Sequence, residues 1–201
     1  MGLKNGVSRA LLCGLALAGA VPAAAQFSDS YNFLKAVRDA DGTKATELLS
    51  KPGAPVVNTR DPSTGETALH IVIKQHNDNW VAFLLNKGAL PDQKDRQGNT
   101  PLHVAALSGD ATASNYLLSQ RAKVDPTNNN GETPLILAVH RKDLVVTRLL
   151  IEAGANPALA DTIAGKSALD YAKDDPRGAA LVKVLAEGKA PPKKAISGPV
   201  L

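Results

Sequence analysis

The stretch Gly98–Asp110, GNTPLHVAALSGD, carries the start and stop signals of one short helix. Thr100 is an N-cap residue, because its hydroxyl can accept a backbone N–H that has no partner within the helix. Pro101 follows at the first helical position, where a missing N–H costs nothing. Gly109 permits the left-handed backbone conformation with which many helices end. The stretch therefore predicts a helix that begins at Pro101 and ends before Gly109.

The same signals recur at a nearly constant spacing along the chain. They start at Gly65, Gly98, Gly131 and Gly165, and each of these glycines is followed two positions later by Thr or Ser. Pairs of large aliphatic residues recur in the second half of the units, at Leu84-Leu85, Leu117-Leu118 and Leu150-Ile151. A period of about 33 residues is typical of stacked repeats, in which each unit buries its apolar face against its neighbours.

With its T-P-L-H-x-A-like core, this unit resembles the ankyrin repeat, over about 120 residues in register. The resemblance implies an all-α repeat solenoid of about five units, each a helix-turn-helix with a hairpin or loop finger. The repeats are expected at about 27–64, 65–97, 98–130, 131–164 and 165–187, together forming one domain over 26–187. The first and last are degenerate, as terminal repeats must be because one face meets water.

Residues 1–25 have the pattern of a secretory signal peptide. Lys4 and Arg9 are basic, Ala10–Val21 is apolar, and Ala23-Ala24-Ala25 supplies an A-x-A cleavage site before Gln26. The apolar run is shorter than the roughly 20 residues of a spanning helix. We therefore expect export to a bacterial periplasm, or secretion, with no stable membrane insertion after cleavage. An uncleaved N-terminal anchor is the alternative.

Residues 188–201, GKAPPKKAISGPVL, lack any periodic apolar face and are rich in Pro, Gly and Lys. This composition predicts a disordered tail. The alternative is a docking peptide, since Pro191-Pro192 favours an extended conformation.

Charge and cysteine content limit the function classes. The chain has 23 Lys and Arg against 19 Asp and Glu. The excess lies in the two ends, because Lys4 and Arg9 belong to the signal segment and Lys189, Lys193 and Lys194 to the tail. A nearly neutral body argues against nucleic-acid binding, which favours a basic stripe. The chain's one cysteine, Cys13, is expected to leave with the signal, so neither disulfides nor thiol chemistry are expected.

No motif supports catalysis or a cofactor. His70 and His103 lie one repeat apart and not one helical turn apart, and the family resemblance implies that they brace the turns between units. Without cysteine ligands or an H-E-x-x-H motif, no metal is expected. ADTIAGKS, residues 160–167, lacks the first glycine of a phosphate-binding P-loop. No nucleophile and base are paired by a known motif, so the sequence predicts a protein that is not an enzyme.

What remains is a surface. In the ankyrin family, partners commonly bind the fingertips and first helices on the concave side, and transfer by register gives eleven candidate protein-binding residues. These are Lys74, Gln75, Arg96, Gln97, Asn99, Leu107, Asn129, Asn130, Glu132, His140 and Arg141. Their mixed charge and many amides suit a polar protein partner of a monomeric scaffold. Arg96 and Arg141 are expected to dominate binding and not to pack in the core. The alternative is an ordinary hydrophilic face.

The resemblance extends to small exported bacterial ankyrin proteins. It implies a periplasmic scaffold or accessory protein that supports a periplasmic enzyme or stress defence. An exported effector or toxin-neutralising protein, which also acts by binding, is the alternative.

Four positions depart from the repeat pattern. Arg121 stands where Gly88 and Gly154 end the neighbouring repeats, which predicts a positive φ or a different backbone route. Trp80 is expected to pack between layers, at an offset matched by Ala113 and Val146, and the alternative is that it anchors a partner. Register also places Tyr31 on the capping threonine and Pro176 on the helix-ending Gly109.

Overall fold

The computed structural model describes residues 23–51 and 56–187, so the predicted tail and almost all of the signal segment lie outside the described residues. Ten α-helices and one 3-10 helix make up the described part: α1 (Ala23–Arg38), α2 (Gly42–Ser50), η1 (Val56–Asn58), α3 (Ala68–Lys74), α4 (Asp78–Asn86), α5 (Pro101–Ser108), α6 (Ala111–Ser119), α7 (Pro134–Arg141), α8 (Leu144–Glu152), α9 (Ala168–Asp174) and α10 (Ala179–Glu187). Helix α1 thus begins before the predicted cleavage site.

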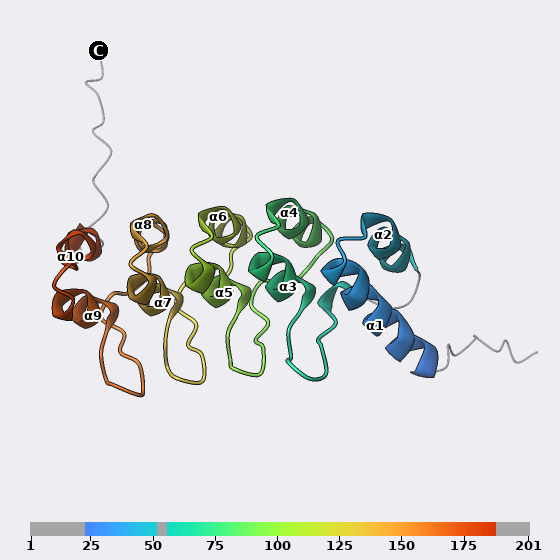
Figure 1. The fold of residues 1–201 in the computed structure, drawn as a ribbon, viewed down its shortest axis with the longest axis horizontal. Coiled ribbons are helices and arrows are strands. Elements are labelled where there is room, and N and C mark those ends of the chain that lie inside the picture. Colours follow the sequence, from blue (N-terminus) through green and yellow to red (C-terminus); the bar gives the residue numbers. More distant parts are fainter. Residues whose placement is uncertain (1–22, 52–55, 188–201) are drawn as a thin grey trace, which may run out of the picture.

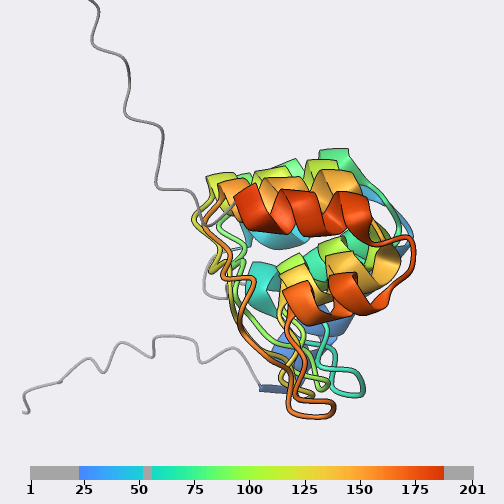
Figure 2. The same ribbon diagram turned by 90° about the vertical axis from the view of Figure 1, so that its left-hand side faces the viewer.

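The helices form two layers in a regular array (Figure 1). Helices α1, α3, α5, α7 and α9 stack side by side in an inner layer, and α2, α4, α6, α8 and α10 lie above them in an outer layer. Loops that we call the first to fourth fingers, residues 59–67, 87–100, 120–133 and 153–167, project below the inner layer (Figure 2). This is the all-α repeat solenoid that the sequence predicted.

The local signals act as expected in the central repeats. Thr100 and His103 form a capping box at the start of α5, and Pro101 is its first residue. Gly109 ends the helix with φ 71°. The following residue, Asp110, is the N-cap of α6 and accepts the N–H of Ala113 at 2.8 Å. One short stretch therefore ends one helix and begins the next.

The core runs continuously through the array. Leu102, Leu117, Leu135 and Leu150 are completely buried, and each comes from a motif that repeats along the sequence. Ala105 and Ala106 are also fully buried. Their small side chains allow the inner helices to approach closely.

Two register assignments are wrong. Tyr31 does not cap a helix, because α1 begins well before it, at Ala23, and leaves the ring 64% exposed. Pro176 is not a left-handed helix end either. Helix α9 stops at Asp174, and its C-cap residue Asp175 has φ −83°. The proline ring fixes φ at a negative value, so the chain cannot take the Gly109 route there.

Several residues with side chains adopt the left-handed conformation. Ala40, His76 and Lys142 do so at the position of Gly109, with φ of 55°, 53° and 62°. Arg121 has φ 61°, which confirms the positive φ inferred from its register with Gly88. Such a backbone costs a non-glycine residue roughly 1 kcal/mol.

Arg121→Gly should therefore stabilise the protein by up to about 1 kcal/mol, because glycine adopts this conformation without the Cβ conflict. Urea melts monitored by circular dichroism would measure the change. The matched control is Gly88→Arg at the same turn of the preceding repeat. A Cβ there would meet no atom within 4 Å, so this substitution changes only the free-energy cost of the backbone conformation. A clearly destabilised Arg121→Gly would contradict this account.

Candidate protein-binding surface

Backbone hydrogen bonds join each finger to the next. In each case an N–H of the later finger donates to the carbonyl one residue before the glycine of the earlier finger. The bonds are Arg96 to Thr64 (2.9 Å), Asn129 to Gln97 (3.0 Å) and Thr162 to Asn130 (2.9 Å). A Cβ on Gly98 would lie 2.8 Å from the backbone nitrogen of Asn129, which is too close. The repeated glycine is therefore required by the neighbouring finger as well as by its positive φ.

The two motif histidines brace the same junctions, as the resemblance implied. Nδ1 of His103 accepts the N–H of Thr100 at 3.1 Å, and its Nε2 lies 3.0 Å from the carbonyl oxygen of Glu132 in the next repeat. With Nδ1 accepting, Nε2 carries the proton and donates it to that carbonyl. His70 makes the equivalent bond to Asn99 at 2.9 Å. Burial lowers the pKa of His70 and lowers that of His103 to about 4, so both rings are neutral at pH 7.

A groove of about 600 Å³ lies on this finger side of the inner layer, between the second and third fingers and helices α5 and α7. We call it the concave groove. Its lining consists of Arg96, Gln97, Asn99, Leu107, Asn128, Asn129, Asn130, Glu132, Leu137 and His140. Eight of the eleven candidate residues are among them. The register transfer missed Asn128 and Leu137.

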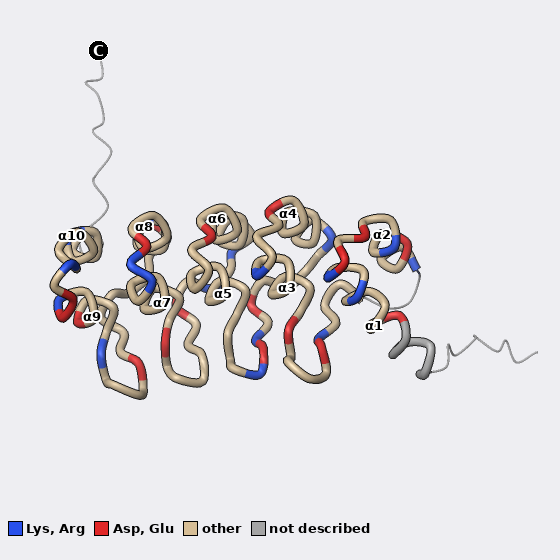
Figure 3. Tube along the Cα trace, in the orientation of Figure 1, with Lys and Arg blue, Asp and Glu red and all other residues tan. Residues whose placement is uncertain are grey.

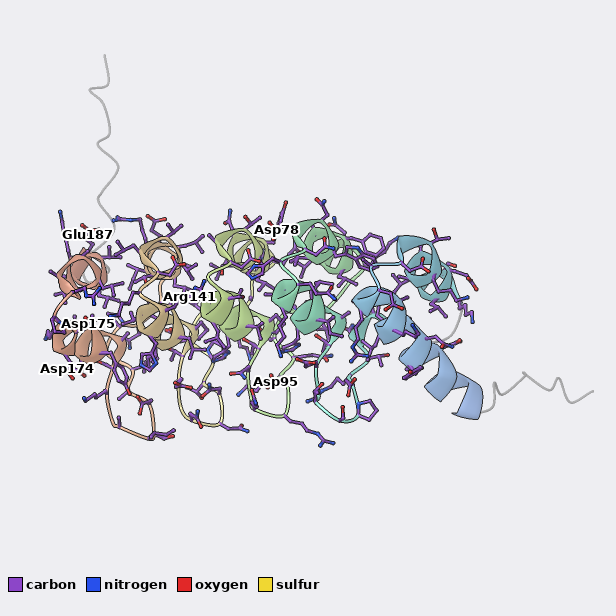
Figure 4. All side chains as sticks on the ribbon, in the orientation of Figure 1. Asp78, Asp95, Arg141, Asp174, Asp175 and Glu187 are labelled. Atoms are coloured by element: carbon purple, nitrogen blue, oxygen red, sulfur yellow. The ribbon has the colours of Figure 1, made fainter. Side chains whose placement is uncertain are left out.

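The amide side chains of the groove are positioned by one another. Nδ2 of Asn128 donates to Oδ1 of Asn99 at 3.1 Å and to Oε2 of Glu132 at 2.9 Å. The carboxylate of Asp95, labelled in Figure 4 at the second finger, accepts the backbone N–H groups of Gln97 and Asn99, both at 2.8 Å. These bonds leave the groove polar but ordered.

Some polar atoms of the groove remain free to contact another molecule. Among the described residues, Nε2 of Gln97, Oδ1 of Asn129 and Oε1 of Glu132 have no hydrogen-bond partner. Leu107, which is 56% exposed, supplies an apolar contact. His140 stands edge-on to Tyr171, with ring centroids 4.3 Å apart. The groove can therefore donate and accept hydrogen bonds around one apolar contact, as binding of a polar protein surface requires.

Three candidate residues do not line the groove. Lys74 pairs with Glu66 within its own repeat. Gln75 donates its side-chain N–H to the carbonyl of Arg38 at 2.9 Å. Arg141, labelled in Figure 4 near α7, lies beyond the edge of the groove.

Arg96 and Arg141 are exposed and lie outside the core, as expected, but both bind the neighbouring repeat. The guanidinium of Arg96 donates to the carbonyl of Pro62 in the preceding finger. Nη1 of Arg141 donates to the carbonyl of Leu107 at 3.3 Å, and the side chain occupies the space beside Gly109. Each arginine thus joins two repeats, because their lengths match the distance to a carbonyl of the neighbouring unit.

The described residues do not favour other ligand classes. They contain no group of three or more His, Cys, Asp or Glu side chains arranged to hold a metal ion. In the same part of the chain, no helix combines the length and apolar character needed to cross a membrane. Basic and acidic residues are interspersed along the described fingers and both helix layers, without a basic stripe (Figure 3).

The fold defines a class of protein, the all-α repeat solenoid. A comparison with known families gives its identity. The family model for ankyrin repeats, which spans three copies, matches residues 33–128 and again 109–194. The chain therefore belongs to the ankyrin-repeat proteins. This family provides protein–protein interaction modules that are generally non-catalytic scaffolds.

The histidine braces predict acid sensitivity. An unfolded histidine has a pKa near 6.5, and that of His103 falls to about 4 in the folded protein. The unfolded state therefore binds more protons between these values, so stability is full above about pH 6.5 and falls as the pH is lowered towards 4. Urea melts across this range would measure the slope.

The matched variant is His103→Ile, because Ile136 occupies the same position in the fourth repeat and is fully buried there. It should be less stable than the parent at pH 7.5 but lose less stability on acidification, with His70 supplying the remaining slope. An unchanged slope would show that protonation of His103 does not cause the loss of stability at low pH.

Proposed function

We propose that this ankyrin-repeat chain is exported to the periplasm, where it binds a polar protein partner in the concave groove as a scaffold or accessory protein. The observation that carries the proposal is the groove itself. Eight of the eleven residues selected by register line one depression, among them residues with free donors and acceptors and the exposed Leu107.

The rigidity of the groove supports binding. Its amides are held by neighbouring side chains, and the finger that carries Asn129 is bonded to the preceding one through backbone and side chain alike, with Nδ2 of Asn129 donating to the carbonyl of Arg96 at 2.9 Å. A surface ordered before binding loses less conformational entropy when the partner arrives. Such a groove suits a folded partner or an extended segment of one.

Binding is best tested with groove residues whose side chains do not join repeats. Gln97→Ala combined with Leu107→Ala removes a free amide and the apolar contact. This variant should keep a melting temperature within a few degrees of the parent. It should weaken capture of a partner from periplasmic extract by tenfold or more, about 1.4 kcal/mol.

The matched control carries Gln120→Ala and Val145→Ala, two exposed side chains of the same kinds at the C-terminal end of α6 and on α8, away from the groove lining. It should capture the partner as the parent does. Loss of capture by the control with full capture by the groove variant would place the binding surface elsewhere. A resident periplasmic enzyme as captured partner fits the accessory role, whereas a toxin would favour the neutralising alternative.

Export is tested separately by mass spectrometry of the chain in a periplasmic fraction. The mature chain should begin near Gln26. Such a cut spares the core, since the first fully buried side chain among the described residues is Phe33. Recovery of the chain there with Met1 retained would argue against cleavage and favour an N-terminal anchor.

A further inference from the structure

The outer layer is interrupted at Trp80. This residue of α4 occupies the position of Ala113 on α6 and Val146 on α8, both of which are completely buried. Trp80 packs against the core but is only half-buried. Helix α4 packs along α6, and α6 along α8, but α2 and α4 make no comparable contact.

The gap forms a second depression, on the outer layer and away from the concave groove. We call it the aromatic notch. Gly42 and Thr46 of α2 line one side, and Asn79, Trp80 and Phe83 of α4 line the other, around about 240 Å³. The two aromatic rings meet edge to face, with centroids 5.6 Å apart. The notch thus exposes aromatic surface beside small side chains.

Charge is uneven around the notch. Asp41, which is exposed, directly precedes Gly42 in the sequence. Asp78, labelled in Figure 4, instead contacts Thr112 of α6 and lies near Asp110, and burial raises its pKa. On α2, Lys44 and Glu47 pair at 2.8 Å and so balance each other. Lys87 lies over the ring of Phe83, 5.7 Å from its centroid and one helix length from Asp78. The notch is therefore aromatic in its middle, with one exposed carboxylate, that of Asp41, beside Gly42.

We propose that the aromatic notch binds residues 188–201 of a second copy of this chain. That segment contains Pro191-Pro192, three lysines and no acidic residue. Adjacent prolines favour the polyproline II conformation, which binds grooves lined by aromatic side chains at little entropic cost. The lysines complement the carboxylate of Asp41 beside the notch.

The segment must come from another copy because its own prolines cannot reach. From α10 to α4 the outer layer takes three steps between neighbouring helices, each about 8–10 Å, or about 24–30 Å in all. Helix α10 ends at Glu187, and the stretch 188–192 spans only about 16 Å as polyproline II.

This contact joins different surfaces of the two copies, so it is a head-to-tail association. A peptide in a notch of this size buries far less than a stable dimer does, so the association is weak. The dilute chain stays monomeric, and self-association appears only as the concentration rises.

Trp80 is the chain's only tryptophan, so its fluorescence reports on the notch directly. The peptide of residues 188–201 would be titrated into the dilute full chain, with tryptophan emission and the anisotropy of labelled peptide as readouts. Both should change along one saturable curve. A peptide with Pro191→Ala and Pro192→Ala should bind at least tenfold more weakly. Equal binding by that peptide, or no change in either readout, would overturn the proposal.

Two variants locate the site. Trp80→Ala restores the residue found at position 113, and Gly42→Leu fills the notch at a position where a Cβ meets nothing within 4 Å. Gly42→Leu also raises helix propensity, so it should fold even if Trp80→Ala does not. Either folded variant should weaken peptide binding at least tenfold, whereas Tyr116→Ala on α6 should not. Unchanged binding by Gly42→Leu would refute the notch as the site.

Discussion

The structure depends on the close backbone contact between successive fingers. The N–H of Asn129 can donate to the carbonyl of Gln97 only because Gly98 has no side chain in between. At the last finger only one of the two requirements for glycine applies, namely the positive φ and not the space taken by a neighbouring finger. Gly165 keeps a positive φ of 65°, but a Cβ there would meet nothing within 4 Å, since no further finger follows in the described part of the chain. The repeat period is therefore the spacing of two features along the sequence. One is the turn that needs a positive φ, and the other is the backbone contact between neighbouring fingers.

The same contacts shape the binding surface. Arg96 contributes its N–H to the finger ladder, its guanidinium to the preceding finger and its carbonyl to Asn129, and it also lines the concave groove. Stability and recognition therefore share residues in this chain. A substitution that tests binding must spare the atoms that join repeats, which the exposed ends of Gln97 and Leu107 allow.

The fold was readable from the sequence because its determinants are local and periodic. The start and end of a helix are marked by Thr100, Pro101 and Gly109. The repetition of the apolar positions determines which helix faces are buried. Only the approximate position of the candidate binding surface could be predicted from the sequence. That Arg141 reaches the carbonyl of Leu107 depends on how far apart the repeats stack, which no single unit encodes. The exposure of Trp80 likewise depends on its neighbour α2, whose small Gly42 and Thr46 leave the ring uncovered.

The side chains that connect neighbouring repeats differ along the array, and this difference affects the concave groove. His103 bridges to the carbonyl of Glu132, whose carboxylate in turn holds Asn128 and Asn130. At the next junction Ile136 replaces the imidazole, and an ion pair between Lys142 and Asp175 at 2.5 Å links the fourth and fifth repeats instead. Within the described residues, the imidazole bridges therefore occur only at the junctions that border the second and third fingers. A neutral His103 supports one side of the groove from behind, so the geometry that a partner meets depends on a buried ring that it never touches.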